Sequence, residues 1–161
     1  MKRALFLDRD GVINKEYNYV HRIEDFDFIP GIFDFCKLFL ERDYIIIIIT
    51  NQAGIARKYY SVNDFNSLTN WMLGEFGREG VNIAKVYHCP HHPDYTGDCK
   101  CRKPNPGMIL EAKSEFDIDI ENSILIGDKI SDIESGINAG IRVNNCYLFN
   151  GDFNYIINDI V

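Results

Sequence analysis

The sequence has no apolar run long enough to cross a membrane. Its longest apolar run, Tyr44–Ile49, has six residues, whereas a membrane-spanning helix needs about 20. The first apolar stretch ends after Leu7, where charged residues begin, so we expect no signal peptide. Basic residues are also scarce: 17 Lys and Arg stand against 24 Asp and Glu, for a net charge of −7. A nucleic-acid binder needs clustered cations. The sequence therefore predicts a protein that binds neither membranes nor nucleic acid.

Internal repeats, low-complexity tracts and flexible linkers are missing as well, so we expect one domain over residues 1–161. Short apolar runs alternate with longer amphipathic ones, which predicts a three-layer α/β fold with a mostly parallel, Rossmann-type sheet. The expected strands are Ala4–Leu7, Tyr44–Ile49, Lys85–His88, Ser123–Ile126 and a fifth around Arg142–Leu148. The expected helices are Ile32–Glu41, a helix that starts at a capping box at Ser61 and runs to about Phe76, Pro106–Phe116 and Ser131–Ala139.

One segment, Cys89–Pro106, has no periodicity over its roughly eighteen residues, and loops of this length are usually functional. Three of the five cysteines lie within it, a pattern that indicates a reduced compartment and metal binding more than a disulfide framework. Cys89, His91, Cys99 and Cys101 supply four ligands, enough for a closed, structural zinc site. The alternative is a loop with free or oxidised thiols.

Polar clusters follow three of the expected strands. Asp8-Arg9-Asp10-Gly11 follows the first strand, Thr50-Asn51-Gln52 the second, and Gly127-Asp128-Lys129-Ile130-Ser131-Asp132 the fourth. In a parallel sheet these positions share one edge, where open α/β folds bind their ligands. Carboxylates two residues apart repel each other unless a cation lies between them. Their oxygen atoms suit Mg²⁺, which also accepts substrate phosphate. A solvated acidic turn is the alternative for any one cluster taken alone.

These motifs, with Lys103, resemble in order the four motifs of the haloacid-dehalogenase-like (HAD) phosphatases. Within them, nearly the whole chain is similar to the heptose 1,7-bisphosphate 7-phosphatase family. The similar segments are Tyr19-Val20-His21, Thr50–Arg57, Leu68–Met72, Cys89–Pro93 and Cys99–Met108. The resemblance implies an uncapped HAD-like domain with a zinc loop at about residues 89–103. It also implies a monomeric, cytoplasmic phosphoric monoester hydrolase that removes the 7-phosphate of a small sugar bisphosphate in lipopolysaccharide or capsule precursor synthesis.

The resemblance implies roles for the residues at the strand ends. Asp8 would be the nucleophile that forms an aspartyl-phosphate, and Asp10 would serve as general acid and then general base. Thr50 and Lys103 would donate hydrogen bonds to the transferred phosphoryl group. Mg²⁺ would be held by Asp8, the backbone carbonyl of Asp10 and Asp128.

The resemblance also implies a set of substrate-contacting residues. They are Glu16, Tyr17, Asn18, Tyr19, Asn51, Gln52, Ala53, Arg102 and Lys129. Arg102 is the candidate for the second, non-reacting phosphate, because a guanidinium group binds phosphate oxygens in pairs. His92 is expected to be a bystander, and Cys36 and Cys146 small core residues.

Three other functions fit part of the pattern. The segment Pro93–Asp98 makes the expected zinc loop short, as in the histidinol-phosphate phosphatases, which are the nearest alternative. A polynucleotide 3′-phosphatase has similar motifs, but the charge of −7 argues against it. A zinc-stabilised binding module without activity would not need the complete set of motif residues. The heptose anomer and the choice between ADP- and GDP-heptose synthesis stay open at this stage.

Overall fold

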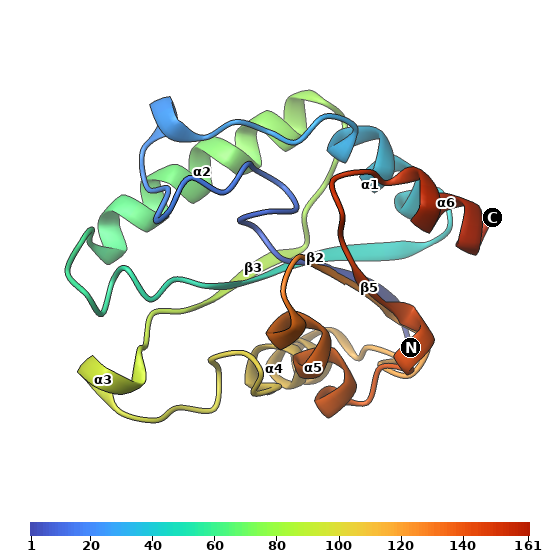
Figure 1. Cartoon of the computed structure of the whole chain (residues 1–161). Coiled ribbons are helices and arrows are strands. Elements are labelled where there is room, and N and C mark those ends of the chain that lie inside the picture. The colour runs from blue at the N-terminus through green and yellow to red at the C-terminus, as the bar shows by residue number, and fades with distance from the viewer.

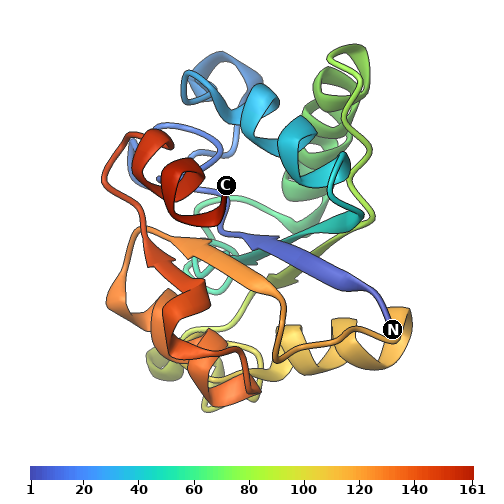
Figure 2. The same cartoon turned by 90° about the vertical axis from the view of Figure 1, so that its right-hand side faces the viewer.

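One five-stranded sheet forms the centre of the molecule (Figures 1 and 2). The computed structural model describes all 161 residues. All neighbouring strands are parallel, in the order β3-β2-β1-β4-β5. The strands are β1 (Arg3–Leu7), β2 (Tyr44–Asn51), β3 (Lys85–Cys89), β4 (Ile124–Gly127) and β5 (Cys146–Leu148). The predicted α/β fold with a parallel sheet is therefore confirmed.

Strand β2 shows why the sheet is buried on both faces. Its isoleucines alternate, with Ile46 and Ile48 packing in one core and Ile47 and Ile49 in the other. A continuous β-branched run suits such a strand, because each face receives every second side chain. Residue Leu7 pairs in register with β2 on one side and with β4 on the other, so the ends of these three strands lie at one edge.

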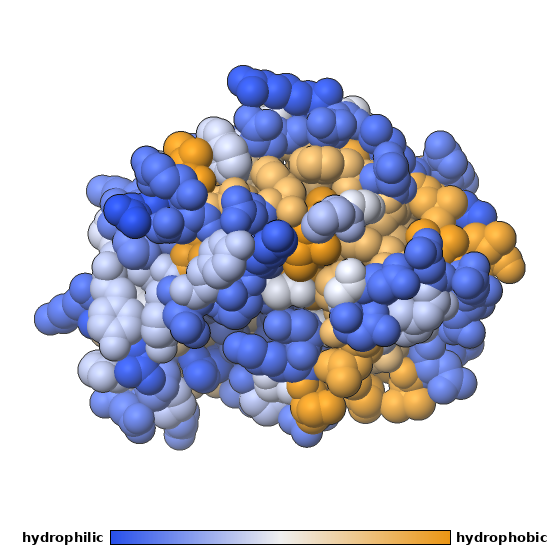
Figure 3. All heavy atoms as spheres, turned by 45° about the horizontal axis from the view of Figure 1, so that its top comes forward, coloured by the Kyte–Doolittle hydropathy of each residue, from blue (hydrophilic) through white to orange (hydrophobic).

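Helices cover both faces of the sheet and form the outer layers (Figures 1 and 2). On one face lie α1 (Ile32–Leu40), α2 (Val62–Arg78) and α6 (Asn154–Ile160), and on the other lie α4 (Gly107–Phe116) and α5 (Ile130–Ala139). The predicted capping box of α2 is present: the Ser61 hydroxyl accepts from Asp64 N, and the Asp64 carboxylate accepts from Ser61 N. In Figure 3, apolar residues gather in the middle of the face that carries α1, α2 and α6 and reach the right-hand and lower margins of the view, whereas polar residues line its top and left.

The structure departs from the predicted elements at four places. Strand β5 begins only at Cys146, because residues Val143–Asn145 form the 3-10 turn η2. A second 3-10 turn, η1 (Ile23–Asp25), and the four-residue helix α3 (Pro93–Thr96) lie in segments expected to be loops. Helix α6 was not expected, since seven residues with a single buried side chain are too short to show a helical period.

The chain between β1 and β2 forms only η1 and α1.

The two cysteines outside the long loop differ in burial. Cys36, on α1, is fully buried in the larger core, as predicted, whereas Cys146 is half-buried against the smaller one. No helix combines the length and the apolar character that crossing a membrane requires.

Candidate active site

The polar clusters predicted at three strand ends meet at one edge of the sheet. Asp8 follows β1, Thr50 lies near the end of β2, and Asp128 follows β4. Oxygen atoms of Asp8, Asp128 and Asp132 lie within 4.8 Å of one another. The chain runs to β2 on one side of β1 and later returns to β4 on its other side. The cluster therefore lies where the strand order reverses, the usual ligand-binding position in such sheets.

Lys103 lies in the centre of this cluster although it comes from the long loop. Its Nζ donates to Asp8 Oδ1 at 2.9 Å, to Asp132 Oδ1 at 2.7 Å and to the carbonyl of Ile49 at 2.9 Å. Burial acts to lower the pKa of Lys103, but the two carboxylates outweigh burial and raise this pKa. The ammonium group is therefore a fixed positive charge beside Asp8.

The sequence analysis assigned no role to Asp132. Its place in the fourth motif was the signal that could have indicated a cationic partner. It is buried, with its Oδ1 on Lys103 and its Oδ2 accepting from the backbone N of Lys129 at 3.0 Å. Asp132 therefore joins the loop lysine to the start of helix α5.

The cluster holds more negative charge than Lys103 can balance. Burial raises the pKa of Asp8 well above its usual range, against the opposing effect of Lys103, and burial also raises the pKa of Asp128. Asp128 Oδ1 is buried and has no hydrogen-bond partner. Gly11, at φ 93°, lies against the Asp128 side chain, where a Cβ would collide with it. A hard divalent cation fits this donor set, because it would bind the orphaned oxygen and balance the excess charge.

The Asp10 carboxylate is held by three neighbouring side chains. Arg9 Nη2 donates to both of its oxygens, at 2.9 and 3.1 Å, Asn14 Nδ2 donates to Oδ1 at 2.9 Å, and Gln52 Nε2 donates to Oδ2 at 3.1 Å. Arg9 is itself buried and also donates to the carbonyl of Val20 at 2.7 Å. Sequence analysis missed Arg9 and Asn14, since nothing in a single sequence shows that a charged residue beside the motif is buried.

A cleft of about 510 Å³ opens above these residues. It is lined by Asp10, Glu16, Asn18, Tyr19, Asn51, Gln52, Ala53, Tyr60, Arg102, Lys103, Pro104, Lys129 and Ser131. A narrower well of about 60 Å³ reaches down to Asp8 and Asp132. The structure thus brings together all the predicted substrate-contacting residues except Tyr17. The Tyr17 side chain is half exposed, and its hydroxyl donates to Asp27 Oδ2 at 2.7 Å.

Three of the four predicted zinc ligands lie together beside the cleft. Cys99 Sγ is 3.6 Å from the Sγ atoms of both Cys89 and Cys101. The structure joins Cys89 and Cys101 in a disulfide, with their Cα atoms 5.5 Å apart. The ring of His91 lies outside this cluster of three cysteines, and the His91 carbonyl accepts from Arg102 Nη1 at 3.2 Å. The structure therefore brings the three cysteines together without the histidine.

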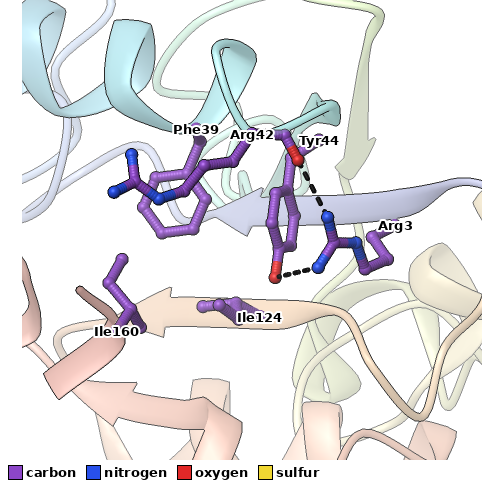
Figure 4. Close-up of a pocket in the computed structure, with 6 residues that line it drawn as sticks. All are labelled: Arg3, Phe39, Arg42, Tyr44, Ile124 and Ile160. Atoms are coloured by element: carbon purple, nitrogen blue, oxygen red, sulfur yellow. Dashed lines mark hydrogen bonds between the residues drawn. The ribbon is translucent and has the colours of Figure 1, made fainter.

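The opposite edge of the sheet carries a second hollow, of about 380 Å³ (Figure 4). Arg3 donates there to the carbonyl of Arg42 at 2.8 Å, and its guanidinium group lies over the Tyr44 ring. Phe39, Ile124 and Ile160 form the rest of its lining. This hollow has no carboxylate, thiol or histidine in its lining. The reactive groups described above therefore lie only at the edge formed by the carboxyl-terminal ends of the strands.

Fold and site together define a HAD-like hydrolase, and a HAD-hydrolase-like family model matches residues 100–144. At 55% identity over 139 residues, the chain is similar to D-glycero-alpha-D-manno-heptose-1,7-bisphosphate 7-phosphatase of Campylobacter jejuni, covering 86% of this chain and 78% of that protein. The beta-anomer enzyme of Haemophilus influenzae is 43% identical over 148 residues, covering 89% and 80% of the two chains. The chain belongs to the heptose-1,7-bisphosphate 7-phosphatase family.

A solved structure of a relative agrees with this family. The D,D-heptose 1,7-bisphosphate phosphatase of B. bronchiseptica, complexed with magnesium and phosphate, superposes with a TM-score of 0.80 at 28% identity. The match covers 86% of this chain and 77% of that one. The predicted family is therefore confirmed, and histidinol-phosphate phosphatase, the nearest alternative, is not favoured.

Proposed function

We propose that this protein is a Mg²⁺-dependent phosphatase that removes the 7-phosphate of D-glycero-D-manno-heptose 1,7-bisphosphate. The observation that carries the proposal is the buried contact of Lys103 Nζ with Asp8 and Asp132, at the bottom of a polar cleft. A buried carboxylate beside a fixed cation is suited to attack on a phosphoryl group, whose charge the cation balances.

In the first half of the reaction, an Asp8 oxygen bonds to phosphorus while the bond from phosphorus to the sugar oxygen breaks. Asp10 gives its proton to that leaving oxygen. In the second half, water attacks the aspartyl-phosphate, Asp10 takes a proton from the water, and Asp8 is released with inorganic phosphate. Lys103 and the hydroxyl of Thr50 stabilise the negative charge on the phosphoryl oxygens in both halves.

Asp8, Asp128 and the backbone carbonyl of Asp10 would hold Mg²⁺. The unpartnered Oδ1 of Asp128 supports this assignment, as does the magnesium bound by the B. bronchiseptica relative. When bound, the metal neutralises the carboxylates and the phosphoryl oxygens together.

The cleft supports a bisphosphate substrate because it has a cation outside the well that reaches Asp8. Lys129 lines both the cleft and the well, whereas Arg102 lines the cleft alone and would bind the 1-phosphate. The relative named for the α anomer is 55% identical and the one named for the β anomer 43%, so we expect the α anomer to be preferred. We further propose that the protein acts as a monomer on a cytoplasmic heptose intermediate of lipopolysaccharide or capsule synthesis.

We also propose that the cluster of Cys89, Cys99 and Cys101 binds a structural zinc ion in reduced protein. Four ligands at about 2.3 Å in a tetrahedron are about 3.8 Å apart, close to the 3.6 Å that separates Cys99 Sγ from Cys89 and Cys101. His91 would complete the shell after its ring turns towards the thiols. The disulfide between Cys89 and Cys101 is the competing state of the same loop.

A phosphate-release panel tests the function. Its substrates are both anomers of heptose 1,7-bisphosphate, histidinol phosphate and a 3′-phosphorylated oligonucleotide. We expect release from the 7-position of the heptose, loss of activity with EDTA, and recovery with Mg²⁺ alone. Faster turnover of histidinol phosphate, or activity that survives EDTA, would overturn the proposal.

A further inference from the structure

Tyr60 is a buried residue of the cleft that has no role in the chemistry described above. It is 7% exposed, lines the cleft, and its hydroxyl donates to Gln52 Oε1. The other end of the same amide group faces the reactive residues: Gln52 Nε2 donates to Asp10 Oδ2 at 3.1 Å and to Thr50 Oγ1 at 2.8 Å. One hydrogen-bonded chain therefore links Tyr60 to both Asp10 and Thr50.

The direction of these hydrogen bonds matters for the phosphoryl group. Asp10 Oδ2 accepts from Arg9 as well as from Gln52, so the amide nitrogen of Gln52 lies on the side of Asp10. The oxygen end of the amide then faces Tyr60, which supplies the donor it needs. With Nε2 donating into its oxygen, Thr50 keeps its own proton for another acceptor. The competing contact, to the carbonyl of Asn51, is long, at 3.4 Å.

Two neighbouring residues hold the Tyr60 ring in place. The imidazole of His21 stacks on it, with ring centroids 4.9 Å apart and planes 7° from parallel. Gly54 also lies against the ring, because a Cβ at this position would collide with it. Burial also raises the pKa of the Tyr60 phenol, which therefore stays protonated and able to donate.

We propose that Tyr60 is a positioning residue that fixes the amide of Gln52, so that the Thr50 hydroxyl points its proton at the transferred phosphoryl group and Asp10 is held at the cleft. The proposal rests on the proposed phosphatase function. It predicts an effect on the chemical step more than on substrate binding, because Thr50 acts on charge that develops during transfer.

The test is Tyr60→Phe, which removes one hydroxyl and leaves the ring. We expect kcat on heptose 1,7-bisphosphate to fall about three- to tenfold, the range for one lost neutral hydrogen bond, with KM within about twofold. Tyr147→Phe is the matched control: it removes a hydroxyl that donates to the Asp159 side chain in a different part of the molecule, and it should leave kcat unchanged. Thermal unfolding of each variant monitors the fold.

A double-mutant cycle separates positioning from a general loss of structure. In a Gln52→Ala background, Tyr60→Phe should cause no further loss of kcat, because the group through which it acts is gone. The inference would be overturned if Tyr60→Phe lowered kcat by the same factor in both backgrounds. An unchanged kcat in Tyr60→Phe alone would overturn it too. Wild-type protein that releases no phosphate from any sugar phosphate would instead overturn the proposed function, and the two failures are distinct.

Discussion

The strand ends and the loop of residues 89–106 bring reactive groups to the same point by different means. Asp8 and Asp128 directly follow β1 and β4, whose register is set by the pairing of Leu7 with Ile126. Lys103 comes from a loop in which only it and Cys89 are buried. The sheet therefore positions the carboxylates through its core, whereas the lysine depends on contacts made by the loop itself.

Those loop contacts are few and polar. The backbone N of Lys103 donates to Asn51 Oδ1 at 3.1 Å, and Gln52 N donates to the carbonyl of Cys89 at 2.7 Å. On the other side, Asn138 Nδ2 donates to the carbonyl of Pro104 at 3.1 Å. Because one hydrogen bond adds only about 1 kcal/mol of net stability, a loop held by so few of them needs a cross-link. The cluster of three cysteines can supply this cross-link, either by binding zinc or by forming a disulfide.

The largest expected effect is at the strand end. Asp8→Asn keeps the size of the side chain and removes the attacking charge, so we expect kcat to fall by about 10⁴-fold or more. Because the substitution also removes a charge from a crowded carboxylate cluster, the unfolding temperature should not fall. Phosphate release and thermal unfolding measured together check this, and near-normal turnover would exclude Asp8 as the nucleophile.

Asp10→Asn should have a smaller effect that depends on the substrate. Loss of general acid catalysis costs about 10²- to 10⁴-fold when the leaving oxygen is a sugar alkoxide. An aryl phosphate has a leaving group that needs little protonation, so its rate should fall much less. Rates for the two substrates give the comparison. Equal losses would mean that Asp10 serves the metal and its neighbours alone.

The difference between the two regions also explains what could be predicted from the sequence. The run Ile45–Ile49 and the acidic residues after short apolar segments were sufficient to predict the sheet and the edge that carries the site. The surroundings of individual side chains were beyond such patterns. The hydroxyl of Tyr17 turns to Asp27 and away from the cleft, and Arg9 is buried against Asp10. The direction of the Tyr17 side chain and the burial of Arg9 depend on how the surrounding segments pack. A periodic pattern in the sequence does not show this packing.

The smallest expected effect tests how the loop is held, through one cysteine of the loop and one of the hydrophobic core. If zinc holds the loop, Cys99→Ser should remove the metal, lower the unfolding temperature by several degrees, and raise KM about tenfold through misplaced Arg102 and Lys103. Cys36→Ser is the matched control. It places a hydroxyl group in the apolar core, so it should also lower the unfolding temperature but leave KM unchanged.

The same pair of variants distinguishes zinc from the disulfide. Cys99 is a free thiol beside the Cys89–Cys101 disulfide, so a disulfide-held loop should tolerate Cys99→Ser and lose stability when a reductant is added. A zinc-held loop should lose stability in Cys99→Ser and keep its stability when a reductant is added. It should also contain about one zinc per chain in protein purified under reducing conditions. Metal content, KM and unfolding temperature with and without reductant are the measurements. Reduced protein without zinc, together with a Cys99→Ser variant that binds substrate normally, would show that zinc does not position Lys103.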